Sequence, residues 1–238
     1  MILLLISCAG GSKTEKKDKA ATVEEHFQFA YSAAERGNLE EAATEYEKVL
    51  KLDSKNAKAH LNLGIVYGRR GKWKKEISEY EKAIRIDPQF AEAHFNLGVA
   101  HQGRGNLKEA MAQYQKALQI HPQYIEAHTN MGILYFRKGM LDEALAEYQK
   151  TIEIKPDYAK GYYNIGSVYR EKKNLEEAIA SFQKALEINP KFAEAHYSLA
   201  VAYYEKKEFK LAIEHCDQAA KSGMLVDPKF LERLKPYR

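Results

Sequence analysis

Four of the six prolines of this chain stand at a fixed spacing of 34 residues, and a glycine and an aromatic residue recur with the same period. These three sets are Pro88, Pro122, Pro156 and Pro190; Gly64, Gly98, Gly132 and Gly166; and Tyr80, Tyr114, Tyr148 and Phe182. Such a period is the signature of a repeat architecture, in which each unit buries its apolar face against its neighbours. The 238 residues therefore divide into six units, 23–56, 57–90, 91–124, 125–158, 159–192 and 193–226, with residues 1–22 and 227–238 outside them.

Each unit has the pattern of two helices. In unit three, apolar and small residues follow the i, i+3, i+4, i+7 spacing of one helix face in the first half and again in the second. Gly103 and Gly105 lie between the halves, and Pro122 ends the second because proline cannot continue a helix. After unit six, Asp227 and Pro228 form a helix start signal. The sequence thus predicts an all-α fold, an α-solenoid of antiparallel helix pairs, with a C-terminal capping helix in residues 227–238. The apolar side of that helix would be Phe230, Leu231 and Leu234.

The repeated residues also carry a family resemblance. The pattern aromatic-x2-Leu-Gly-x2-Tyr, then Ala-x3-aromatic, then Pro resembles the tetratricopeptide repeat, and it extends over residues 23–226. The end units match less well, as expected of capping units: unit one has Ala30 for the glycine, and unit six has Cys216 for the aromatic residue. The resemblance implies a superhelix whose first helices line a concave groove for a partner protein or peptide.

The sequence argues against an enzyme, a cofactor or a metal site. Only 34 residues lie outside the repeats, and the chain has no HExxH, GxSxG, CxxC or phosphate-loop motif. Five histidines share one slot of the unit, but equivalent side chains of stacked units lie about 8–10 Å apart, whereas zinc ligands lie about 2 Å from the metal. We therefore expect no catalytic residue, and a structural ring between the two helices of a unit at His26, His60, His94, His128 and His196.

The charge of the chain is nearly balanced. A net charge of +4 from 37 basic and 33 acidic residues is too small to indicate nucleic acid as a partner. The charge is uneven along the array, because unit one carries −4 (4 basic, 8 acidic) and unit two carries +4 (8 basic, 4 acidic). Basic residues crowd the turn of unit two; they are Arg69, Arg70, Lys72, Lys74 and Lys75. This basic turn is interpreted either as a solvated surface or as a contact for an anionic partner. Trp73, in its middle, takes the slot that Leu107 and Leu141 fill in later units, which predicts a core position.

One unit breaks the rule for small residues. Glycine inside a helix costs about 1 kcal/mol relative to alanine, so its return at one position predicts that the partner helix crosses close to it. The small residue that opens the second helix is alanine in five units, but Glu76 stands there in unit two. Either the helix rotates locally and exposes the carboxylate, or a nearby basic residue pairs with it.

The N-terminus resembles a bacterial lipobox. Leu5-Ile6-Ser7-Cys8 has the order of that motif, and residues 9–21 have the composition of a flexible tether. The resemblance implies that Cys8 is the lipid attachment residue and that the protein is held at the cell envelope by this anchor only. The apolar run is shorter than a secretory h-region and lacks a basic n-region, which predicts a truncated start. The alternative is an accidental match in a cytoplasmic protein.

The sixth position of each unit carries a row of carboxamides and related polar residues. It is Gln28, Asn62, Asn96, Asn130, Asn164 and Ser198, and this row is similar to the asparagine ladder in the superhelical repeats of O-GlcNAc transferase. Each asparagine offers a donor and an acceptor to the backbone of an extended peptide; alternatively, each bonds a neighbouring helix and only fixes stacking. The fifth position adds apolar and aromatic side chains, so the predicted peptide-binding residues are Asn62, Asn96, Asn130, Asn164, Phe95, Tyr163 and Tyr197.

Two functional interpretations follow. The first is an envelope-anchored scaffold that binds a partner polypeptide in its groove, resembling in architecture the pilotin-like proteins of pilus assembly or adaptors of cell-wall enzymes. The second is a cytoplasmic adaptor or chaperone without a lipid. A carboxylate clamp for acidic C-terminal peptides is disfavoured, because Lys58 and Lys160 have no matching second base in the groove.

Overall fold

The computed structural model describes residues 11–238, with side chains from Thr22 onward, so Cys8 lies outside the described residues. This part of the chain contains α-helices, one short 3₁₀ helix and no strand, which confirms the all-α prediction. The elements are α1 (Gly11–Glu35), α2 (Leu39–Leu52), α3 (Ala57–Arg69), α4 (Trp73–Ile86), α5 (Ala91–Gln102), α6 (Leu107–Ile120), α7 (Ile125–Arg137), α8 (Leu141–Ile154), α9 (Ala159–Glu171), α10 (Leu175–Ile188), α11 (Ala193–Glu205), α12 (Phe209–Lys221), α13 (Pro228–Leu234) and η1 (Lys235–Tyr237).

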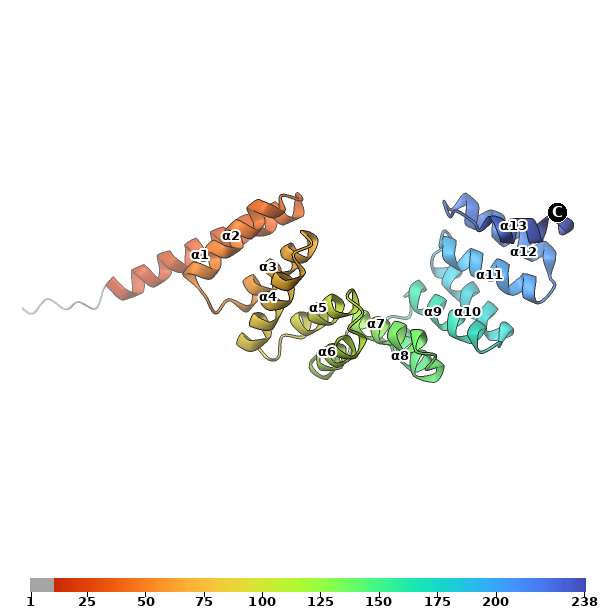
Figure 1. The fold of residues 1–238 in the computed structure, drawn as a ribbon, viewed down its shortest axis with the longest axis horizontal. Coiled ribbons are helices and arrows are strands. Elements are labelled where there is room, and N and C mark those ends of the chain that lie inside the picture. Colours follow the sequence, from red (N-terminus) through yellow and green to blue (C-terminus); the bar gives the residue numbers. More distant parts are fainter. Residues whose placement is uncertain (1–10) are drawn as a thin grey trace, which may run out of the picture. The chain divides into compact units, whose positions relative to one another are not determined.

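The helices pack as consecutive pairs in two compact bodies (Figure 1). The N-terminal body, Met1–Pro122, holds α1 to α6, and the C-terminal body, Gln123–Arg238, holds α7 to α13 and η1. Within each body, the second helix of one pair packs against the first helix of the next. From unit two onward, the first helix begins at the first residue of the unit, at Ala57, Ala91, Ile125, Ala159 and Ala193.

The repeated glycine brings the two helices of a unit into close contact, as the sequence predicted. A Cβ added at Gly132 would lie 2.5 Å from Cε1 of Tyr148, and one at Gly98 would lie 2.7 Å from the same atom of Tyr114. Both tyrosines are buried. Any side chain at the glycine would therefore displace the ring that fills the core of the unit.

The two ends of the array differ. At the C-terminus, α13 is capped by Asp227, whose side chain accepts a hydrogen bond from the backbone N–H of Lys229. Of the three apolar residues predicted for this helix, Phe230 and Leu234 are buried and Leu231 is half-buried. At the N-terminus, Phe29 is 49% exposed, although the equivalent residue of every later unit is buried. Those buried equivalents are Leu63, Leu97, Met131, Ile165 and Leu199.

The structure differs from the sequence analysis at the start of α1. The sequence predicted a flexible tether for residues 9–21, but the helix already begins at Gly11. The physical reason is composition, because alanine, lysine and glutamate, which are frequent in this stretch, are strong helix formers. No helix in the described part of the chain is both long and apolar enough to cross a lipid bilayer.

Candidate functional site

The first helices of the units form the surface on which the sequence places the binding residues. Here this first-helix surface means α1, α3 and α5 in the N-terminal body, and α7, α9 and α11 in the C-terminal body. Within the bodies, α1 contacts α3, α3 contacts α5, and α9 contacts α11, so neighbouring first helices lie side by side. Side chains at one position of successive units can therefore meet a single bound chain within a body.

The asparagines of the N-terminal body hydrogen-bond to their own helices. Nδ2 of Asn62 donates to the carbonyl oxygen of Lys58 at 2.9 Å, and Nδ2 of Asn96 donates to that of Glu92 at 3.0 Å. Both asparagines are half-buried. Each bond uses one of the two Nδ2 hydrogens, and neither asparagine makes a further hydrogen bond within the described chain. The carboxamides are thus oriented by their own backbone, and their Oδ1 acceptors are not engaged by a neighbouring helix.

The asparagines of the C-terminal body are also half-buried. Nδ2 of Asn164 is buried and has no hydrogen-bond partner among the described residues, whereas Asn130 has an interaction partner. In unit six, Ser198 at the same position is buried. The residues at the sixth position therefore differ in their hydrogen bonding. Asn62 on α3 and Asn96 on α5 are alike, since each donates to a carbonyl oxygen of its own helix.

The predicted aromatic residues of the surface are half-buried, because each packs on an aromatic ring behind it. The ring of Phe95 lies 5.7 Å from that of Tyr114, and the ring of Tyr163 lies 5.7 Å from that of Phe182. Tyr197 contacts the capping helix, with its ring edge-on to Phe230 at 5.5 Å. Through these contacts the aromatic side chains at the fifth position contribute to the hydrophobic core.

Two members of the fifth position do not line a surface at all, and this corrects the expectation of an apolar row there. Leu61 is 3% exposed and Thr129 is 4% exposed. Apart from Phe29 at the N-terminal end, the exposed large apolar side chains of the first-helix surface are at the ninth position, where Tyr31 is 50% and Val99 is 41% exposed. The 3.6-residue helical period puts both positions on one face, but it does not say which of them the second helix covers.

The histidine slot is structural, as predicted. Each ring binds, through Nδ1, the residue 19 positions later on the second helix of its unit. The pairs are His26–Glu45 (2.6 Å), His60–Glu79 (2.6 Å), His94–Gln113 (2.8 Å), His128–Glu147 (2.7 Å) and His196–His215 (3.0 Å). Among the described residues, no group of three potential ligands is arranged to hold a metal ion.

The pKa values of two members of these pairs, Glu79 and His215, differ from their usual values. Burial by itself raises the pKa of Glu79, but hydrogen bonds from His60 and Lys82 outweigh burial and hold that pKa below its usual value. In unit six, burial and then the neighbouring His196 lower the pKa of His215. His215 therefore favours its neutral form, because a charged ring there would be desolvated.

Glu76 is paired with a basic residue, which decides between the two alternatives for this position. Its Oε2 lies 3.1 Å from Nη2 of Arg104, in the turn that follows the next unit's first helix. Burial raises the pKa of Glu76, and the attraction of Arg104 offsets this only in part. The carboxylate occupies the space beside Gly68, where an added Cβ would lie 2.6 Å from Oε1.

Trp73 is not a core residue, contrary to the prediction. It is 46% exposed, with the guanidinium carbon of Arg104 5.2 Å and Nζ of Lys74 5.3 Å from its ring centre. The helix α4 begins at Trp73, so the residue stands at the edge of the helix pair. A leucine at this place is half-buried in units one, three and four, whereas the larger indole extends into solvent.

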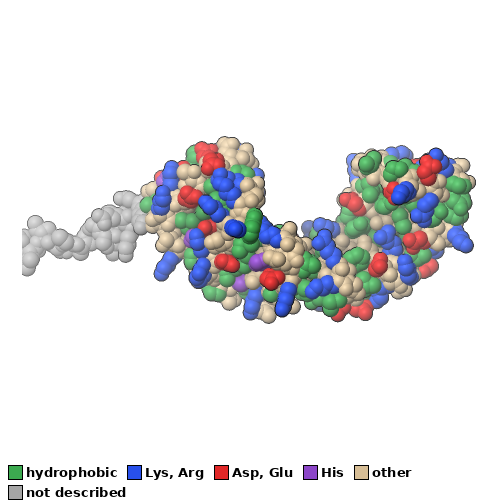
Figure 2. Space-filling model, in the orientation of Figure 1, with side chains coloured by type: hydrophobic (Ala, Val, Ile, Leu, Met, Phe, Trp, Pro, Cys, Tyr) green, Lys and Arg blue, Asp and Glu red, His purple; other side chains and the backbone are tan. Residues whose placement is uncertain are grey.

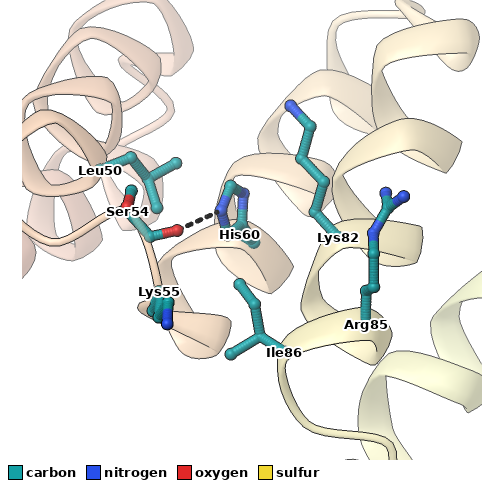
Figure 3. A pocket seen from close by; sticks show the side chains of 7 residues that line it. All are labelled: Leu50, Ser54, Lys55, His60, Lys82, Arg85 and Ile86. Atoms are coloured by element: carbon teal, nitrogen blue, oxygen red, sulfur yellow. Dashed lines mark hydrogen bonds between the residues drawn. The ribbon is translucent and has the colours of Figure 1, made fainter.

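A hollow of about 570 Å³ lies between the end of α2 and α4 (Figure 3). Its wall includes Lys55, Lys82 and Arg85. His60, also in this wall, binds Glu79 through Nδ1 and lies 3.3 Å from the carbonyl oxygen of Ser54 through Nε2. Both ring nitrogens are thus engaged, so His60 holds the turn between α2 and α3.

The similarity to known proteins follows the repeats. A family model described as TPR repeat matches residues 31–71, 69–105, 103–139, 134–170 and 166–207, and a second, described as tetratricopeptide repeat, matches residues 193–222. No curated protein matches the chain.

Solved structures with the same fold include three that cover most of the chain. A MamA protein is 31% identical over 74% of this chain and 96% of its own, with a TM-score of 0.63. PilF from Pseudomonas aeruginosa is 25% identical over 76% and 83%, with a TM-score of 0.69. YrrB, described as a TPR protein with an unusual peptide-binding site, is 29% identical over 79% and 97%, with a TM-score of 0.61. The period, the helix pairs and these matches together show that the chain belongs to the tetratricopeptide-repeat family, whose members act as protein-interaction scaffolds.

Proposed function

We propose that this chain is a non-enzymatic scaffold that binds an extended segment of a partner polypeptide on its first-helix surface. The observation that carries the proposal is the pair Asn62 and Asn96, each hydrogen-bonded to its own helix. Asparagine is a poor residue for a helix interior, so its return at this position calls for a role outside helix formation. The peptide-binding site named for YrrB supports the same use of the fold.

The spacing of the units suits an extended chain. Neighbouring helices pack about 8–10 Å apart, and an extended chain advances about 3.3 Å per residue, so one asparagine would meet about every third residue. Each free Oδ1 would accept a hydrogen bond from a backbone N–H of the partner. Tyr31 and Val99, the exposed apolar residues beside the row, would contact its side chains.

The test is site-directed photocrosslinking in the source cells with the full chain. A photoreactive residue at Val99, on α5, should capture a discrete partner, whereas the same residue at Gln115, exposed on α6, should not. Val99 lies on the proposed surface and Gln115 on a second helix, so the two sites differ mainly in the face that they present. Equal capture at both sites would contradict binding on the first-helix surface.

The site of action is proposed to be the bacterial cell envelope, with the protein held there by a lipid on Cys8. The support is the order Leu5-Ile6-Ser7-Cys8, and by architecture a pilotin-like role or an adaptor of a cell-wall enzyme fits such an anchor. The alternative is a cytoplasmic adaptor with the same surface and no lipid.

The lipid proposal makes a separate prediction. In a bacterial host, palmitate labelling should be lost in Cys8→Ser, and the protein should move from the membrane to the soluble fraction, because one acyl-modified residue provides the anchor. The matched control is Cys216→Ser, since Cys216 is buried in unit six. A wild-type chain that is already soluble when expressed from its full upstream coding sequence would contradict the envelope proposal and favour the cytoplasmic alternative.

A further inference from the structure

The turn between α3 and α4 carries an exposed indole in a position where the other units have a half-buried residue. Trp73 is 46% exposed, while its equivalents in the other five units are half-buried. These equivalents are Leu39, Leu107, Leu141, Leu175 and Phe209. Exposed tryptophan is uncommon on a monomer surface and is enriched at the energetic centres of protein interfaces.

Basic side chains surround this indole, and only part of their charge is neutralised. Arg70 pairs with Glu40, and Arg104 pairs with Glu76. The three lysines of the turn form no ion pair with an acid of the described chain; they are Lys72, Lys74 and Lys75. A hollow of about 280 Å³ beside the indole is lined by Gly71, Lys72, Trp73, Lys74 and Lys75. We call these five residues, with Arg104, the Trp73 surface.

Equivalent turns of the same chain carry fewer cations, although lysine also stands at the position of Lys74 in units three and six (Lys108 and Lys210). At the position of Lys72, units one, three and five have asparagine, and at the position of Lys75, units one, three, four and five have glutamate. At the position of Lys74, units one, four and five have an acidic residue. The repeat therefore folds without the cations, so helix pairing does not account for them.

We propose that the Trp73 surface binds an acidic segment of a partner polypeptide, independently of the first-helix surface. Lysines without an ion pair around an exposed indole favour a partner whose carboxylates lie at the rim of a contact with an aromatic centre. A polypeptide fits better than a nucleic acid, because the surface offers one aromatic ring and no row of rings on which successive bases could stack. On the faces of the two bodies that Figure 2 shows, basic and acidic side chains are interspersed.

The repeats themselves supply variants that preserve the fold. Trp73→Leu copies units one, three, four and five, and Lys74→Glu with Lys75→Glu copies units one and five. The matched control is Lys51→Glu with Lys55→Glu, which makes the same change of charge at exposed lysines of the same body, away from the turn. Circular dichroism and melting temperature establish that each variant is folded.

The probe is a fluorescently labelled peptide, Glu-Glu-Leu-Glu-Glu-Leu-Glu-Glu, titrated against the full chain at low and physiological salt. We expect binding that weakens with salt, as for any contact between exposed charges. Trp73→Leu and the Lys74/Lys75 variant should each weaken binding by about tenfold or more, as loss of an interface centre does. The control variant and Asn62→Ala/Asn96→Ala should bind like wild type.

Other outcomes overturn the proposal. Equal loss in the Lys51/Lys55 control, or no loss in Trp73→Leu, would reduce the effect to general charge attraction. Preferential binding of phosphatidylglycerol-containing vesicles or of a single-stranded oligonucleotide, with no binding of the peptide, would assign the surface to a membrane or to a nucleic acid. Failure of the first-helix surface to bind a partner would leave this result untouched, because Asn62 and Asn96 are not among the residues of the Trp73 surface.

Discussion

Replacing Gly68 and Glu76 together by alanine should raise the free energy of unfolding by about 1–2 kcal/mol, within the range of combined stabilising changes. The double variant copies unit one, where Ala34 and Ala42 stand at the same two positions. It removes a carboxylate whose pKa is raised by burial. It also replaces a helical glycine by alanine, which favours the helix by about 1 kcal/mol.

The single variants should not add up to this gain. Gly68→Ala alone should lower the free energy of unfolding by about 1 kcal/mol, the lower end of overpacking, because its Cβ would lie 2.6 Å from Oε1 of Glu76 and would push the carboxylate from Arg104. Glu76→Ala alone should leave stability unchanged or raise it by about 0.5–2 kcal/mol. Unfolding in urea, followed by circular dichroism, measures the coupling between the two sites.

Gly103→Ala provides the control for glycine replacement as such. Gly103 ends α5 with helical φ and ψ angles, and a Cβ there would find only ordinary contacts, the nearest at 3.5 Å. This change should be stabilising by about 0.4–1 kcal/mol through the unfolded state alone. If Gly68→Ala has the same effect in the presence and absence of Glu76, the carboxylate is not what fills the space beside Gly68.

Replacing Asn62 and Asn96 by alanine should weaken binding of the crosslinked partner by about 10- to 100-fold. Two carboxamides would each lose a hydrogen bond to the partner backbone, worth about 0.5–1.5 kcal/mol. The melting temperature should stay unchanged or rise slightly, since each side chain bonds only its own helix and alanine is the better helix former. Partner affinity and melting temperature are measured on the same double variant.

Asn106→Ala is the matched control, because Asn106 is exposed in the turn before α6 and its side chain makes no capping hydrogen bond. A fall in melting temperature of the Asn62/Asn96 variant with unchanged binding would mean that the row fixes the stacking of the units. In that case the carboxamides have no part in recognition, and Tyr31 and Val99 become the residues to replace next.

The period of the sequence determined the helix pairs and much of their interior. A proline every 34 residues follows the second helices of units two to five, and the first helices of units two to six begin where the units were drawn. The glycine at the crossing point and the histidine between the helices were predictable as well. Their neighbours lie within the same repeat, and the repeat occurs several times, so a local pattern was sufficient to locate them.

Departures from the period needed the tertiary structure. Glu76 is accommodated by Gly68 on the facing helix of its own unit. Thr151 stands at a position where most other units have alanine, and it faces Gly161 on the next unit's first helix. A Cβ at Gly161 would lie 2.7 Å from Oγ1 of Thr151. In both cases a larger side chain on one helix is matched by a glycine on another helix. The helical period of the sequence does not tell which residue of a neighbouring helix lies opposite a given position.

The binding surfaces show the same division. The sequence by itself determined which positions lie on the first helices and that asparagine recurs among them. Only the tertiary structure decided that these asparagines bond their own backbone, that Leu61 and Thr129 are buried, and that Trp73 is exposed. The reason is that exposure depends on how far a neighbouring helix covers each position, which is fixed by packing between helices and not by the order of residues within one helix.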